Sequence, residues 1–178
     1  QLSGLHYFIS KKSSQRIYDY DYIGFGNADY STLRKNKDNS STSQVLRSCK
    51  WNNLRYSGAE IKEPLKNKNL IKKYKLYENK DANEKNLKKK INSKLLHLSI
   101  HSSSKNILNE KMIGAALITS SDKQNDGILT LDELYQNSEF KTDLVVLSSC
   151  ESGIGQNVNF SEFKSLSLTF KILGSSQV

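Results

Sequence analysis

The feature that most constrains the fold is a pair of short apolar segments that each end in a reactive side chain. They are residues 94–101 (KLLHLSIH) and 143–153 (DLVVLSSCESG). Both are rich in branched apolar residues and far shorter than the roughly 20 residues that cross a membrane, so we expect two buried strands. If these strands are parallel neighbours, His101 and Cys150 meet at the carboxyl edge of one sheet, where open α/β folds build their sites.

Helix-start signals stand between the predicted strands and indicate an α/β fold with a mostly parallel central sheet flanked by helices. Capping-box spacing predicts helices that begin at Ser57–Glu60, Asp81–Glu84 and Thr130–Glu133. We expect Leu87 and Ile91 to share a face of the second helix. Further predicted elements are strands over 17–25, 70–77 and 113–120, a turn at 24–27, a flexible loop over 30–48, a helix over 159–173 and a strand that begins in the last residues. A chain of 178 residues is of a size for one domain, 1–178.

Cysteine and lysine usage restrict the location and the partners. The two cysteines, Cys49 and Cys150, form no disulfide framework, which is typical of a reducing compartment and predicts a cytoplasmic protein that does not span a membrane. Residues 62–94 hold twelve lysines and four acidic residues, and so carry most of the net charge of +9. Because no arginines interleave with these lysines, we expect a solvated surface without direct nucleic-acid contact.

A thiol that faces an imidazole is the minimum equipment of a cysteine nucleophile. His101 stands at the end of its predicted strand, whereas His97 lies inside it and is expected to be a satisfied core histidine. The small residues after Cys150, with Glu151, Ser152 and Gly153 nearest, let backbone N–H groups approach a substrate carbonyl. No further ligand stands at a metal-like spacing from these groups, so we expect neither a metal nor another cofactor.

Four motifs in this order resemble the CHAT domain family, a branch of the caspase–separase-like cysteine peptidases: 96–101 (LHLSIH), 126–133 (DGILTLDE), 145–153 (VVLSSCESG) and 165–170 (SLSLTF). With residues 55–60 and 79–92, the resemblance extends from about Ile17 to the last residue. It implies a caspase-like sandwich and a Cys–His dyad that hydrolyses peptide bonds of a protein or peptide substrate. By position, His101 would be the base, Cys150 the nucleophile, and the backbone N–H groups of Cys150 and Ser102 the oxyanion donors.

The resemblance also implies control by a regulatory protein or a fused helical-repeat domain. The lysine-rich residues 62–94 and the 30–48 loop are the candidate contact surfaces for such a partner. The final strands and helices of the family would follow Val178, so we expect this domain to lack its C-terminal portion.

Departures from the family pattern leave two alternatives open. Ser102 replaces the glycine that usually follows the histidine, and 158–161 replaces glycines, which is compatible with an inactive interaction module. Ser148, two residues before Cys150, carries no charge where some relatives place a specificity residue. Separately, Asp122, Asp126 and Glu133 have nearly the spacing of an EF-hand loop, which would make the domain a calcium-binding regulator. A plain turn followed by a helix cap explains the same pattern.

Overall fold

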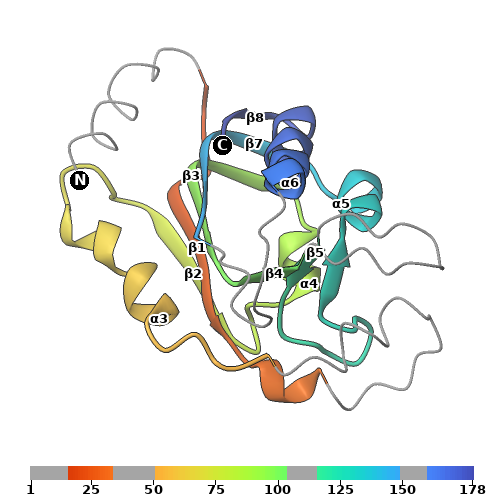
Figure 1. The fold of residues 1–178 in the computed structure, drawn as a ribbon. Helices are drawn as coiled ribbons and strands as arrows, with labels where there is room; N and C mark the ends of the chain where they lie inside the picture. The colour runs from red at the N-terminus through yellow and green to blue at the C-terminus, as the bar shows by residue number, and fades with distance from the viewer. Residues whose placement is uncertain (1–15, 34–50, 104–115, 149–159) are drawn as a thin grey trace.

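A five-stranded parallel sheet forms the centre of the molecule in the computed structural model, which describes residues 16–33, 51–103, 116–148 and 160–178 (Figure 1). The strand order is β2-β1-β3-β7-β8, and every neighbouring pair is parallel. Helices flank this sheet, so the predicted caspase-like α/β sandwich is confirmed. The strands of the sheet are β1 (Tyr20–Ala28), β2 (Tyr74–Asn79), β3 (Ile91–Ser99), β7 (Phe140–Leu147) and β8 (Ser175–Gln177).

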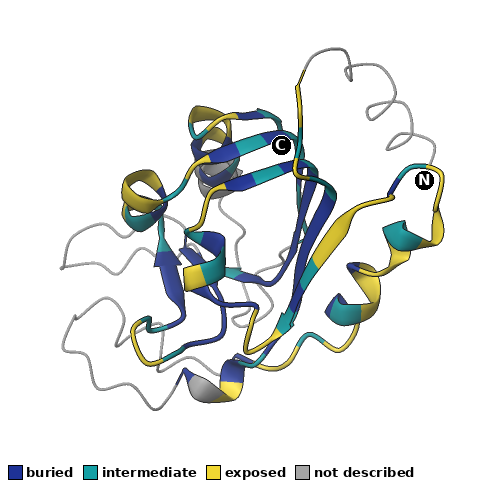
Figure 2. Ribbon diagram, turned by 180° about the vertical axis from the view of Figure 1, so that it is seen from behind, coloured by how far each residue is buried: buried dark blue, intermediate teal, exposed yellow. Residues whose placement is uncertain are grey.

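The two faces of the sheet are covered by different elements. One face packs under the short helices α3 (Ser57–Glu60) and η2 (Glu63–Lys66), with a small core around Tyr22, Ile71 and Leu95. The other face forms the main core with α4 (Glu84–Leu87), α5 (Leu131–Asn137) and α6 (Phe160–Ile172) on its side. Figure 2 shows the buried strands in the centre and the exposed residues on the outer helices. Successive residues of a strand point to opposite faces, and because elements cover both faces of the sheet, the second half of β3 is buried on both.

A second, antiparallel sheet takes over where β3 ends. It consists of β4 (His101–Ser103), β5 (Ala116–Ile118) and β6 (Ile128–Thr130). The prediction that His101 ends the same strand as His97 is therefore wrong, because β3 stops at Ser99 and His101 opens β4. Ile100 between them is fully buried, and the His101 amide donates to the Tyr30 hydroxyl. The bend at Ile100 separates the surroundings of the two histidines.

The predicted turn at 24–27 is also wrong, because β1 runs through it to Ala28. The glycines there serve close packing. A Cβ atom at Gly26 would lie 2.8 Å from the Ser57 carbonyl oxygen, so the absence of a side chain lets α3 approach the strand.

Two predicted helices differ from the structure, the first at its cap and the second at its end. Ser57 is not a helix cap, because its hydroxyl donates to the Leu54 carbonyl and accepts from the Asn27 amide of β1. In the second helix, α4 ends at Leu87, and Ile91 already begins β3. By contrast, the capping box of Thr130 and Glu133 is present and starts α5.

The predicted loop over 30–48 begins with a short helix and not with irregular chain. Residues Tyr30–Thr32 form the 3-10 helix η1, and both Tyr30 and Leu33 are buried. The rest of that predicted loop, 34–48, lies outside the described residues.

Candidate active site

The carboxyl ends of β3 and β7 lie side by side, as the sequence predicts. Leu98 pairs with Leu147, and the Ser148 amide then donates to the Leu98 carbonyl at 2.9 Å. Cys150, Glu151, Ser152 and Gly153, and also Cys49, lie outside the described residues. This described stretch thus ends at Ser148, two residues before Cys150 and next to β3. The pairing of Cys150 with His101 stays a prediction.

His101 is a buried side chain with a fixed ring. Its Nε2 lies 2.7 Å from the carbonyl oxygen of Asn52. A carbonyl oxygen only accepts hydrogen bonds, so Nε2 carries the hydrogen, and Nδ1 is the nitrogen that takes up a proton. The rings of Tyr30 and Trp51 pack on the imidazole with centroids 4.8 and 5.2 Å away. These contacts set both the tautomer and the orientation.

Burial lowers the pKa of His101 below its ordinary value of 6.5, and the hydrogen bond to Asn52 opposes this only in part. The desolvated imidazolium is the disfavoured form. At neutral pH the ring is therefore uncharged, the state in which a histidine accepts a proton from a thiol.

His97 has a different environment on the opposite side of the bend. Its Nδ1 lies 3.1 Å from the Tyr22 hydroxyl, and its Nε2 lies 3.2 Å from the Ser148 hydroxyl. Burial lowers its pKa, against the opposing effect of the nearby Glu60 carboxylate. With a partner at each ring nitrogen, His97 has the surroundings of a core histidine.

Glu60 is a residue of this region that the sequence did not single out. Its Oε2 accepts a hydrogen bond of 2.6 Å from Ser99, and its Oε1 lies 3.4 Å from His97 Nε2. It also forms a hydrogen bond with Ser148. Thus α3 delivers a carboxylate to the carboxyl ends of β3 and β7. In the sequence Glu60 is only the last position of a capping box, 39 residues before Ser99, so no local pattern reveals it.

Comparison with known families decides the class. The sequence matches the CHAT domain over residues 5–178. The chain belongs to the CHAT domain family. This family is related to the caspase-like peptidases, in agreement with the sandwich described above. Searches of curated proteins and of solved structures found no match. Among its described residues, the CHAT domain has no helix that is long and apolar enough to cross a membrane.

Ser102, the residue after the histidine, lies in β4 of the CHAT domain opposite Leu117 of β5. It is partly buried. Its backbone N–H as an oxyanion donor stays a prediction.

In the 122–133 loop of the CHAT domain, aspartate side chains accept hydrogen bonds from backbone amides of the same loop. Asp122 accepts from the amides of Gln124 and Asn125, and Asp126 accepts from the amide of Ile128. Glu133 closes the capping box and forms an ion pair with Lys88 at 3.0 Å. The segment before the loop is strand β5 and no entering helix. Within the described residues, no group of three His, Cys, Asp or Glu side chains could hold a metal ion.

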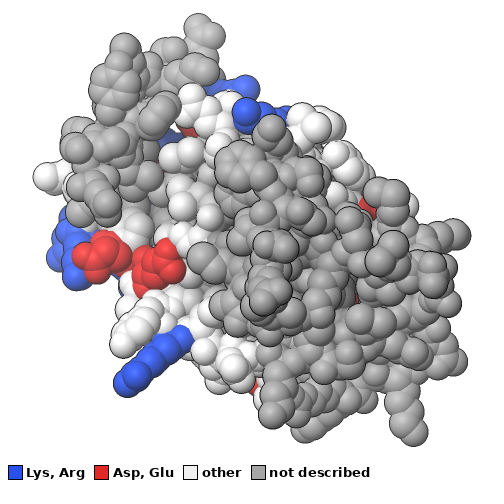
Figure 3. Space-filling view, in the orientation of Figure 1, with Lys and Arg blue, Asp and Glu red and all other residues white. Residues whose placement is uncertain are grey.

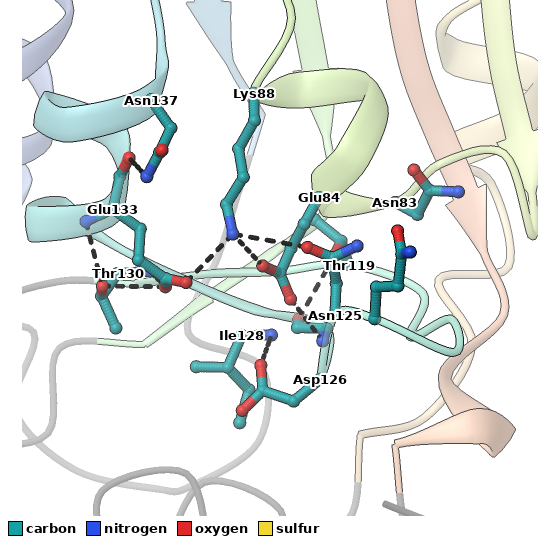
Figure 4. A network of polar contacts seen from close by, with 12 residues as sticks. Asn83, Glu84, Lys88, Thr119, Asn125, Asp126, Ile128, Thr130, Glu133 and Asn137 are labelled. Atoms are coloured by element: carbon teal, nitrogen blue, oxygen red, sulfur yellow. Dashed lines mark hydrogen bonds and ion pairs between the residues drawn. The ribbon is translucent and has the colours of Figure 1, made fainter.

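A polar network under this loop centres on Glu84 (Figure 4). Glu84 is buried, accepts from the Gly127 amide and pairs with Lys88 at 2.7 Å. Burial raises the pKa of Glu84 to about 7, against the opposing hydrogen bond and charge of Lys88. Gly127 has a positive φ of 89°, which a glycine adopts readily, and this lets the tight turn present its amide to Glu84. The network ties α4 to the loop.

The lysine-rich segment 62–94 forms many ion pairs within the CHAT domain. Pairs of 2.6 to 2.8 Å join lysines of this segment to acidic residues: Lys62–Glu78, Lys66–Glu63, Lys88–Glu84, Lys90–Glu139 and Lys94–Asp21. These lysines are partly neutralised by their neighbours, which agrees with a solvated surface.

Proposed function

We propose that this CHAT domain is a cysteine endopeptidase in which Cys150 is the nucleophile and His101 the acid–base. The observation that carries the proposal is the His101 ring, whose Nε2 donates to the Asn52 carbonyl so that Nδ1 is the proton acceptor. This ring follows β3, and the neighbouring strand β7 leads to Cys150. Family membership supports the same class of chemistry.

In the proposed reaction, the Cys150 thiol gives its proton to Nδ1 of His101, and the sulfur attacks the carbonyl carbon of the substrate. The C–N bond breaks as the imidazolium returns the proton to the leaving amine, which leaves a thioester on Cys150. Water, deprotonated by His101, then releases the carboxylic acid and restores the thiol. Backbone N–H groups of Cys150 and Ser102 would hold the oxyanion, with Glu151, Ser152 and Gly153 lining the approach.

The decisive experiment combines peptide cleavage with labelling by a peptide that carries an electrophilic warhead. We expect Cys150→Ala to abolish both and His101→Ala to lower cleavage by about 10²- to 10⁴-fold, the usual contribution of general acid–base catalysis. Cys49→Ala is the matched thiol control and should retain activity. If the Cys150 thiol titrates near about 8.5 both with and without His101, the dyad is refuted and an inactive interaction module is the better description.

We also propose a cytoplasmic location, supported by the low cysteine content, and control by a regulatory protein or helical-repeat domain. Lys88 is a poor candidate for the contact with this partner because it already pairs with Glu84 and Glu133. Alanine replacement of the exposed Lys89 and Lys90 tests the part of that surface next to Lys88. Unchanged activation would exclude it.

A further inference from the structure

Glu60 places a carboxylate, held by hydrogen bonds, at the carboxyl ends of β3 and β7. Ser99 at the end of β3 and Ser148 after β7 both form hydrogen bonds with it. The helix that carries Glu60 is held against β1 by the close approach at Gly26. The carboxylate is therefore positioned by rigid elements and not by a flexible loop, which is the condition for selective binding.

This carboxylate is charged and open to an external cation. Partial burial raises its pKa, but the hydrogen bonds from Ser148 and Ser99 and the nearby His97 outweigh this effect and hold the pKa below its ordinary value of 4.5. Its side chain is 42% exposed. A carboxylate has about four acceptor positions, and the contacts above leave room for a further donor.

Glu60 also differs from the other acids on its side of the molecule. Glu63 and Glu78 pair with Lys66 and Lys62, and exposed acidic side chains lie beside basic ones over α3 and η2 in Figure 3. Within the described ranges, no lysine or arginine forms an ion pair with Glu60, whose only such contact is His97. Because burial keeps His97 uncharged at neutral pH, the charge of Glu60 is not compensated there.

The position relative to the proposed nucleophile follows from the chain. Ser148 precedes Cys150 by two residues, and two residues span at most about 7 Å. A substrate bound at Cys150 therefore passes close to the carboxylate that Ser148 contacts. A lysine or arginine side chain is the substrate group that forms charge-assisted hydrogen bonds with such a carboxylate.

We propose that Glu60 selects substrates with lysine or arginine at the residue whose carbonyl Cys150 attacks. This inference rests on the proposed peptidase function and adds the class of substrate. Ser148 and Ser99 act as positioning residues, because they hold the carboxylate and carry no charge themselves. The uncharged Ser148 thus stands beside a charge that comes from α3.

The test uses two peptides that differ only in this residue, lysine in one and norleucine, which lacks the ammonium group, in the other. We expect the wild-type protein to have a kcat/KM about 10- to 100-fold higher for the lysine peptide, the range expected for a hydrogen-bonded charge pair. Glu60→Gln should bring the ratio close to one by lowering kcat/KM for the lysine peptide. Glu63→Gln, which removes an exposed carboxylate of η2 that is paired with Lys66, should leave the ratio as in the wild type.

The outcomes separate this inference from the proposed function. If the wild-type protein cleaves the norleucine peptide or a glutamate peptide with the same kcat/KM as the lysine peptide, the role of Glu60 is overturned and the peptidase function is left intact. The same holds if Glu60→Gln cleaves both peptides with the wild-type ratio. If Glu60→Gln does not fold, the wild-type ratio alone decides. A wild-type protein that neither cleaves nor reacts with the electrophilic peptide overturns both proposals.

Discussion

The buried Glu84 makes the stability of this domain depend on pH in a direction opposite to that of most carboxylates. Its pKa is raised from 4.5 to about 7, first by burial and further by the nearby Asp126 and Glu133. The folded state therefore binds this proton more tightly than the unfolded state. Its contribution to stability is complete below about pH 4.5 and is lost as the pH rises through about 7.

Glu84→Gln isolates this contribution. The variant keeps an oxygen that accepts from the Gly127 amide and removes the titration. The two pKa values differ by about 2.5 units, and each unit corresponds to about 1.36 kcal/mol. The free energy of unfolding of the variant, relative to the wild type, should therefore increase by about 3 kcal/mol between about pH 4.5 and about pH 8. The attraction of Lys88 for the ionised form is already contained in this pKa, so it needs no separate correction.

Urea unfolding at a series of pH values, followed by the fluorescence of the single tryptophan, Trp51, measures this difference. Glu139→Gln is the matched control, because Glu139 pairs with Lys90 on the surface and its side chain is 62% exposed. The free energy of unfolding of this control, relative to the wild type, should change by less than about 0.5 kcal/mol over the same pH range. If the free energy of unfolding of Glu84→Gln relative to wild type stays constant or decreases with rising pH, the raised pKa of Glu84 is refuted. Glu84 would then be ionised over the whole range, and the effect of the Lys88 pair on its pKa would outweigh the effect of burial.

Three further predictions test the packing and the site. Gly26→Ala should cost about 1–3 kcal/mol in thermal or urea unfolding, because its Cβ would lie 2.8 Å from the Ser57 carbonyl oxygen; an unchanged stability would mean that α3 shifts freely. Thr130→Ala should cost about 1 kcal/mol through loss of the capping box, whereas Thr130→Ser should cost much less. The acid limb of kcat/KM should lie below pH 6.5, because burial lowers the pKa of His101 and only the neutral ring accepts the thiol proton; a limb above that value would contradict this assignment.

Local patterns predicted the elements whose burial is encoded in a few consecutive residues. The apolar runs before Ser99 and Ser148 became neighbouring parallel strands, and the capping box of Thr130 started its helix. The same kind of pattern failed at Ser57, because its hydroxyl accepts a hydrogen bond from the Asn27 amide of β1, which is distant in the sequence. It failed also at Gly24 and Gly26, since glycine permits both a turn and a close approach. Propensity is a weak guide where a tertiary contact competes for the same polar group.

The sequence by itself thus determined the sheet, the pairing of the two strands that lead to His101 and Cys150, and the family. Only the tertiary structure decided which nitrogen of His101 is the proton acceptor, because the Asn52 carbonyl that sets it lies 49 residues away. It also brought Glu60 to Ser99 across 39 residues of chain. Hydrophobic periodicity is local and can be read from neighbouring residues, whereas a hydrogen bond between distant segments exists only once packing has brought them within about 3 Å.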